Sequence, residues 1–263
     1  MADFGAKDVK ALRDSTGAGM MDAKKALTEA GGDTEAATQL LREWGLSKAA
    51  KRSDRENTEG CVAMARDANK VALVLLRSET DFSAKSDDFI AVAQKLADCA
   101  LAGDDAAAVC NEEIENLKLT KKENIDVGSI EIIEAADGNE LDAYLHVQDG
   151  RGVNGVVVEG TGVDAEALHS IALHIAFAKP RFLSKDEVSE DDVAKEREAL
   201  LEITKAEGKP EAAWDKIVDG RLTAWYRESV LLEQDLSSDN KKSVAEAAAP
   251  GTLARFVQIR IGV

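Results

Sequence analysis

Residues 77–84, RSETDFSA, hold the side chains of this chain that are best suited to act on another molecule. They follow a run of strand-forming residues at 71–76, and they place the carboxylate of Asp81 beside the ring of Phe82. Only six of the 263 residues are phenylalanine. Two interpretations are open. Phe82 folds back as a cap on its own hairpin, or it stands out from a stiff loop as an apolar wedge for another protein.

The three histidines, His146, His169 and His174, do not have the spacing of a metal site. His169 and His174 are five residues apart on a predicted helix, which places them on different faces. His146 lies near the end of a predicted strand, and its spacing alone favours an ordinary surface residue. An enzyme that uses Asp81 and His146 as acid and base is an alternative, and it requires a deep pocket that joins them.

A G-x-G-x-x-G pattern at residues 150–155 resembles a nucleotide-binding fingerprint. Such a fingerprint must open a helix, so that backbone amides face a pyrophosphate. Here three valines follow, at 156–158, and they predict a strand. We therefore interpret the glycines as a turn between two strands. The sequence predicts no catalytic residues, no bound metal and no cofactor.

Composition restricts the partners. The chain carries 50 acidic against 33 basic residues, a net charge of −17, so it repels phosphate backbones and we expect no direct contact with nucleic acid. It has no apolar run long enough to span a membrane. Its three cysteines, Cys61, Cys99 and Cys110, form no C-x-x-C pair and suit a reducing compartment. We expect a cytoplasmic protein with protein partners and no small-molecule substrate.

Residues 1–47 predict a small bundle of three short helices. The first stops near Thr16 and Gly17, the second covers residues 21–30, and Asp33 caps the third. Met20 and Met21 are consecutive, so they cannot both face one small core, and at least one reaches solvent or a partner. A loose core that holds both is equally open. Residues 48–60 are polar and predict a linker or an exposed helix extension.

The remaining elements alternate between strands and helices, which defines an α+β fold. We predict a β-hairpin at 61–77 with its turn at 67–69, and a helix at 87–101. Residues 103–128 are acidic and then helix-prone. Further predicted elements are strands at 129–136, 141–147, 155–159 and 255–261, a helix at 164–178, and a helical hairpin, 186–228, that breaks at Gly208 and Pro210 and projects as a short coiled coil.

A weak internal repeat indicates two similar α+β subdomains. The strand at 71–76 leads to the helix at 87–101, and the strand at 155–158 leads to the helix at 164–178. We place the first subdomain at 61–128 and the second at 129–185 with 229–263. The first connector takes ten residues, 77–86, and the second takes five, 159–163. The longer one holds Asp81 and Phe82, and extra loop length often carries function.

Two stretches together resemble the signatures of the bacterial translation elongation factor Ts family. Residues 12–27, LRDSTGAGMMDAKKAL, resemble its N-terminal signature, and residues 79–82 with Ala84 and Lys85 resemble its second signature. Residues 208–210 and 239–242 also resemble the family. This resemblance implies a ubiquitin-associated-like (UBA-like) bundle, a core of two subdomains and a protruding coiled coil. It also implies a guanine nucleotide exchange factor, not an enzyme, that binds elongation factor Tu.

The resemblance also implies which residues contact the partner. In the family the segment equivalent to Thr80, Asp81, Phe82 and Ser83 disturbs the magnesium site of the GTPase, and the phenylalanine wedges beside a helix. The residues that match family contacts elsewhere are Arg13, Met20, Met21 and His146. The chain departs from the family pattern at Ala23, where cysteine is usual, at residues 77–78, where Asn-Cys is usual, and at Ser83, where valine is usual. We expect Ser83 to make the loop tip less apolar.

A protein-binding adaptor without exchange activity remains the alternative. It would bind a peptide or helix through the bundle and alter no nucleotide site. The exchange hypothesis predicts a divided interface, because burying one phenylalanine contributes roughly 1.5–3 kcal/mol, at best about a hundredfold in rate.

Overall fold

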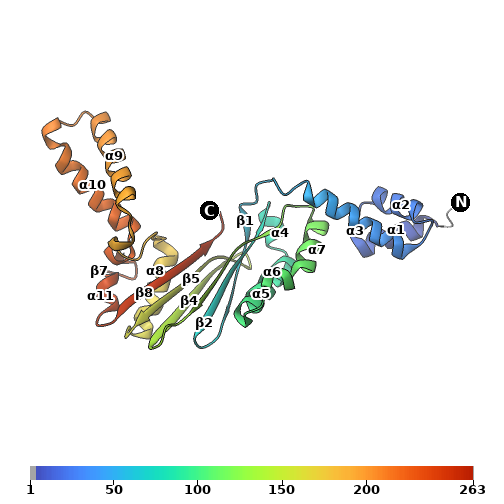
Figure 1. The fold of residues 1–263 in the computed structure, drawn as a ribbon, viewed down its shortest axis with the longest axis horizontal. Coiled ribbons are helices and arrows are strands. Elements are labelled where there is room, and N and C mark those ends of the chain that lie inside the picture. Colours follow the sequence, from blue (N-terminus) through green and yellow to red (C-terminus); the bar gives the residue numbers. More distant parts are fainter. Residues whose placement is uncertain (1–3, 263) are drawn as a thin grey trace.

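The computed structural model describes residues 4–262 of the chain. The molecule is elongated, with an N-terminal helical bundle at one end, a helical hairpin at the other and a β-sheet core between them (Figure 1). The predicted α+β class and its three kinds of building unit are confirmed.

The bundle consists of α1 (Ala6–Thr16), α2 (Met20–Glu29) and α3 (Thr34–Ala50). Gly17, at φ 67°, ends α1 in the left-handed conformation that glycine adopts without strain. The Oδ1 of Asp33 accepts the backbone N–H of Ala36 at 3.0 Å and caps α3 as predicted. The buried core is small, and its members are Val9, Leu12, Ala23, Ala26, Leu27, Ala37 and Leu41.

Helix α3 continues past the predicted end of the bundle and lies against α7 (Asn111–Lys121) of the core. A Cβ at Gly45 would lie 2.1 Å from the Cδ2 of Leu119, so the two helices meet where this side chain is absent. Arg42 also bonds Glu112 at 3.1 Å. The start of the expected linker, 48–60, is therefore helix, and the bundle is attached to the core by packing.

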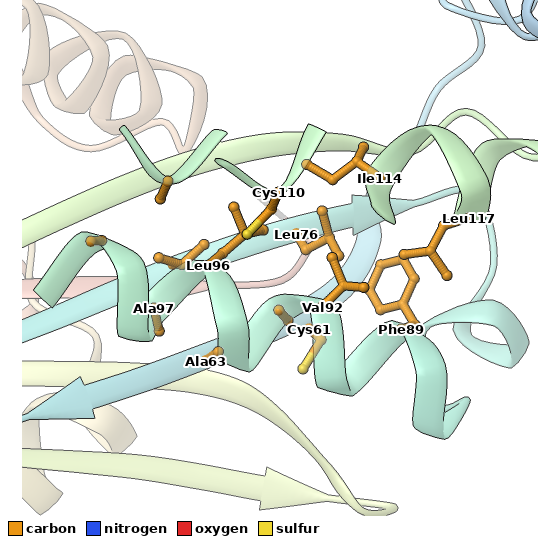
Figure 2. Packing of buried hydrophobic residues seen from close by; sticks show 14 of the residues in the cluster. Cys61, Ala63, Leu76, Phe89, Val92, Leu96, Ala97, Cys110, Ile114 and Leu117 are labelled. Carbon is orange, nitrogen blue, oxygen red and sulfur yellow. The ribbon is translucent and has the colours of Figure 1, made fainter. Parts of the chain in front are cut away.

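The first sheet has the order β1-β2-β3, all antiparallel, from β1 (Glu59–Arg66), β2 (Lys70–Ser78) and β3 (Asp126–Glu134). One face is covered by α5 (Asp87–Ala102), α6 (Ala106–Val109) and α7. In Figure 2 the side chains of Phe89, Val92 and Leu117 gather in the space between α5 and α7. The stretch 103–128 therefore forms two helices that complete this core, and then the start of β3.

The second sheet has the order β4-β5-β8, from β4 (Asn139–Gln148), β5 (Arg151–Thr161) and β8 (Thr252–Arg260). Helix α8 (Ala165–Ala178) covers one face. The small strands β6 (Asp235–Leu236) and β7 (Asp239–Ser243) and helix α11 (Val244–Ala248) close its end. Between β4 and β5, Asp149 at φ 52° and Gly150 at φ 81° form a two-residue turn, which confirms our interpretation of the glycine pattern.

Strand β3 pairs differently from our expectation. We placed residues 129–136 at the start of the second subdomain, but Ser129 pairs with Leu75 and Glu134 with Lys70 in the first sheet. The boundary that we expected after residue 128 therefore cuts through β3. Local periodicity predicted the strand, whereas its partner depends on residues more than 50 positions away.

The two sheets face each other and share a core of their own, formed by Val62, Val71, Leu73, Leu75, Ile133, Ala143, Val157 and Ile259. The core is thus built of four layers: helix, sheet, sheet and helix. Strands β2 and β5 are buried on both faces, which explains their continuous apolar runs at 71–76 and 156–158.

The helical hairpin consists of α9 (Glu190–Ala206) and α10 (Trp214–Ser229), with short 3₁₀ turns at Lys185–Glu187, Glu211–Ala213 and Leu231–Glu233. It projects from the second sheet (Figure 1). Arg197 and Asp219 join the two helices at 2.7 Å, and Arg221 bonds Glu207 at the same distance. No helix in residues 4–262 is both long and apolar enough to cross a bilayer.

Candidate functional site

The segment that leaves β2 forms one helical turn, α4 (Asp81–Ala84). Thr80 caps it, because the Oγ1 of Thr80 accepts the backbone N–H of Ser83 at 3.2 Å. The ring of Phe82 is 86% exposed, the highest value among the large apolar side chains of the described residues. Phe82 is therefore not a cap on its own hairpin, and the wedge interpretation matches its position.

Glu123, just beyond the end of α7, holds α4 in place. Its Oε2 accepts the backbone N–H groups of Glu79 and Thr80, both at 3.1 Å. Its Oε1 accepts the hydroxyls of Thr80 at 2.7 Å and Ser83 at 2.6 Å. Four hydrogen bonds to one carboxylate fix the backbone on both sides of Asp81, so Phe82 is carried on a braced turn.

The inner side of the turn is anchored in the first subdomain. Ser78 is fully buried and donates its hydroxyl to the carbonyl of Thr80 at 3.0 Å. Ala84 is also fully buried, and Ser83 is only 4% exposed. Our expectation that Ser83 makes the tip less apolar is therefore wrong. Ser83 points inward to Glu123, and the tip consists of Asp81 and Phe82.

Asp81 is exposed and bonded to Lys85, one turn along the chain. The Nζ of Lys85 donates to the Oδ2 of Asp81 at 2.7 Å. This hydrogen bond, together with the positive charge of Lys85, lowers the pKa of Asp81 below its ordinary value. The same bond is the largest cause that raises the pKa of Lys85. The carboxylate beside Phe82 is therefore ionised at neutral pH.

Lys85 also connects α4 to the second sheet. Its Nζ lies 3.0 Å from the Oδ2 of Asp149 in the turn between β4 and β5. That hairpin carries His146, which is exposed and shares a hydrogen bond of 3.1 Å between its Nδ1 and the hydroxyl of Tyr144. Val147, the next residue, is 54% exposed. The end of β4 and α4 are thus tied together through one lysine.

The alternative of an enzyme finds no support in the cavities. Of the two hollows that we describe, one is lined by residues of α2 and the other lies at β8, and neither is lined by Asp81 or His146. His174 is buried and bonded to Gln234 at 2.8 Å, and His169 is bonded to Asp142 at 2.8 Å. Within residues 4–262 we find no cluster of side chains that could hold a metal ion.

The bundle residues form a second exposed group. Met20 is 45% and Met21 is 76% exposed, so neither belongs to the buried core. Arg13 is half-buried and bonds Asp14 beside it through its Nε at 2.8 Å. Met21 also lines a shallow hollow of about 240 Å³ with Lys24 and Lys25. Figure 1 places α1 and α2 at the far end of α3 from α4, so the two groups occupy separate surfaces.

Sequence reasoning missed Glu123. It lies 40 residues beyond Ser83, in a stretch that is acidic and helix-prone, and nothing in its neighbourhood distinguishes it from the other acids there. Only the fold brings the end of α7 to the end of β2.

An exposed aromatic ring on a braced turn, with an ionised carboxylate beside it, is the geometry of a protein-binding surface. Comparison with known proteins gives the family. A family model described as "Elongation factor TS" matches residues 79–263. The chain belongs to the elongation factor Ts family.

Several bacterial proteins named elongation factor Ts are similar to this chain over nearly their full length. Elongation factor Ts of Cutibacterium acnes is 47% identical over 270 residues, which cover 98% of each chain. That of Mycolicibacterium gilvum is 43% identical and covers 100% of this chain and 99% of its own. That of Deinococcus radiodurans is 40% identical and covers 97% and 99%.

Proposed function

We propose that this chain speeds the release of GDP from elongation factor Tu by presenting Phe82 and Asp81 to the magnesium site of that GTPase. Proteins of the elongation factor Ts family are its nucleotide exchange factors in translation elongation, and this chain is an exchange factor, not an enzyme. Translation elongation takes place in the cytoplasm, where we expected the protein. The observation that carries the role of Phe82 is its 86% exposure on a turn that is held by four hydrogen bonds to Glu123.

The proposed action follows from how a GTPase holds GDP. Backbone amides and a bridging Mg²⁺ neutralise the phosphates, so GDP leaves slowly, and displacement of the cation removes much of that neutralisation. A carboxylate and a rigid ring that enter beside the cation favour the nucleotide-free state. A partner accelerates release only by binding that state more tightly than the GDP-bound state. Because this coupling is reciprocal, GTP in turn displaces the exchange factor.

The interface in this proposal is divided. Burial of the Phe82 ring in the partner can speed GDP release by at best about a hundredfold. Further contacts come from Arg13, Met20 and Met21 on the bundle, and from His146 at the end of β4. In this arrangement the UBA-like bundle, 1–47, and the two-subdomain core act as separate contact units. Packing of α3 on α7 supports it, because it sets the spacing between the two exposed surfaces.

The test is the release of a fluorescent GDP analogue from elongation factor Tu, with and without this chain. We expect micromolar chain to accelerate release, measured with excess unlabelled GDP present so that the labelled GDP does not rebind. Acceleration that is absent while the two proteins still bind would favour the adaptor alternative over exchange. If Phe82→Ala accelerated release as much as the unchanged chain, the exchange function would still hold, but Phe82 would have no part in it.

A further inference from the structure

A hollow of about 430 Å³ lies at the outer edge of the second sheet, and we call it the β8 groove. Strand β8 is the last in the order β4-β5-β8, so within residues 4–262 one of its two backbone edges has no neighbouring strand. Phe256, Val257 and Gln258 all line the hollow. Successive side chains of a strand point to opposite faces of the sheet. A hollow that is lined by three in a row therefore contains the open edge itself.

Besides β8, three parts of the chain line the β8 groove. They are Glu131 of β3, residues of the segment that follows α8 (Lys179, Pro180, Arg181 and Leu183), and Glu187. The segment after α8 is held to the base of the hairpin, because Ser229 accepts the backbone N–H groups of Arg181 and Phe182 at 2.8 and 3.1 Å. Two backbone hydrogen bonds thus hold the segment that lines the groove.

The β8 groove is positively charged in an otherwise acidic molecule. Its charged lining residues are Lys179, Arg181, Arg255, Arg260, Glu131 and Glu187. Arg255 is neutralised by the buried carboxylate of Glu159 at 2.5 Å, and Glu187 accepts the backbone N–H of Leu183 at 2.6 Å. Lys179, Arg181 and Arg260 form no ion pair within the described residues. Set against the carboxylates of Glu131 and Glu187, they leave the lining with one net positive charge in a chain of net charge −17.

We propose that the β8 groove binds an extended acidic segment of a partner protein, which adds as a strand to the open edge of β8. The backbone edge supplies the N–H and C=O groups that strand addition needs. The cations Lys179, Arg181 and Arg260 face the carboxylates of the added segment, and a guanidinium binds a carboxylate through two parallel hydrogen bonds. Residues 255–260 span about 20 Å at roughly 3.3 Å per residue, which suits a segment of six to eight residues.

Nucleic acid fits this groove less well. Three free cations neutralise few phosphates, and the net charge of −17 repels the rest of a polyanion. Phe256 is the one aromatic ring in the lining, and it is partly buried against the core under α8. It offers no platform on which successive bases could stack. A short acidic peptide carries its charge only along the groove and has a backbone that can pair with the strand.

The test uses the full chain, labelled with ¹⁵N, and an acetylated octapeptide of alternating valine and glutamate as the probe. The binding surface is mapped by NMR at 50 mM salt. We expect shifts of the backbone amides of residues 255–260 and 179–183. Affinity should fall about tenfold at 500 mM salt, because ion pairs at a surface are screened. The same peptide with lysine in place of glutamate should not bind. None of these readouts uses elongation factor Tu, so they are independent of the exchange function.

Charge reversal of the groove gives the sharper comparison. We expect Arg181→Glu with Arg260→Glu to weaken peptide binding at least tenfold, and the conservative Arg181→Lys with Arg260→Lys to retain most of it. Lys195→Glu with Lys216→Glu, at exposed positions of α9 and α10, changes the net charge equally and should leave binding intact. Because Arg260 is half-buried, Arg181→Glu alone, at an exposed residue, serves as a second variant.

Four results would overturn the proposal. They are the absence of shifts up to millimolar peptide, shifts confined to residues outside the groove, undiminished binding by the charge-reversed variant with its fold intact by circular dichroism, and tighter binding in the groove of a single-stranded RNA octamer than of the peptide.

Discussion

The two strand-to-helix connectors of the core lie at equivalent places in their subdomains, but one buries its large apolar side chain and the other exposes it. Between β5 and α8 the chain needs only residues 162–164, and the apolar residue there, Val163, is 5% exposed and belongs to the core under α8. Between β2 and α5 the chain takes residues 79–86, and the large apolar residue there, Phe82, is 86% exposed. One connector serves the core of its own subdomain, and the other presents a ring to solvent.

The difference shows what it takes to hold an apolar ring in water. A flexible loop would let the ring fold back on nearby apolar surface, since burial is favourable at about 25 cal/mol per Å². The longer connector prevents this with a helical turn capped by Thr80, four hydrogen bonds to Glu123 and two buried anchors, Ser78 and Ala84. The shorter connector needs no such bracing, because burial of Val163 itself fixes it.

The largest effect on exchange is expected from Phe82→Ala. We expect about ten- to a hundredfold slower GDP release at fixed concentration, which is the rate equivalent of roughly 1.5–3 kcal/mol of lost burial in the partner. Stability should be unchanged, because the ring makes no core contact. The matched control is Phe177→Ala on α8, where the ring is 76% exposed. If both variants slowed GDP release to the same degree, the exposed ring of the longer connector would have no special role in exchange.

Val163→Ala should lower stability and leave exchange unchanged, the opposite of Phe82→Ala. Removing two methyl groups from a buried site costs about 1–3 kcal/mol of the free energy of unfolding. Exchange per folded molecule should stay the same. Urea unfolding followed by circular dichroism measures the first quantity, and release of labelled GDP measures the second. A variant of full stability that exchanges slowly would mean that the second connector also contacts the partner.

Glu123→Gln tests the brace directly. The amide of glutamine can replace one oxygen, but its NH₂ group meets the donors of Thr80 and Ser83, so part of the network is lost. We expect about three- to tenfold slower exchange through lost preorganisation. The amides of residues 79–83 should exchange hydrogen faster. Glu166→Gln in the first turn of α8 is the control. Unchanged amide protection at residues 79–83 would show that Glu123 is not needed.

The smallest effect concerns the charge at the tip. The pKa of Asp81 is lowered, so its contribution to stability is present above the ordinary carboxyl value and is lost as the pH falls through the lowered value. The pKa of Lys85 is raised, so the contribution of Lys85 to stability is lost only as the pH rises through that raised pKa. The pair therefore persists across the neutral range. Lys85→Met should return the pKa of Asp81 toward its ordinary value in a carboxyl NMR titration, and Asp149→Asn should not.

Much of the fold was predictable because it depends on local pattern. The helices at 87–101 and 164–178 and the hairpin at 61–77 follow from periodicity and turn residues, and the structure has α5, α8 and the β1–β2 pair there. The exposure of Phe82 was one of two open alternatives, because sequence spacing does not show whether a ring finds a surface to cover. The contacts of Arg13, Met20, Met21 and His146 with a partner stay predictions.

The sequence by itself determined the family, the types of most of the longer helices and strands, and the two strand-to-helix units, since each depends on residues that are close together along the chain. Tertiary structure decided that β3 completes the first sheet, that Glu123 reaches across 40 residues to hold the turn at Thr80 and Ser83, and that Ser83 points inward. It also decided that the open edge of β8 lies in one hollow with three cations that form no ion pair within the described residues. These features depend on pairing and packing between distant segments, and no local pattern of residues encodes which distant partner a strand edge or a carboxylate will meet.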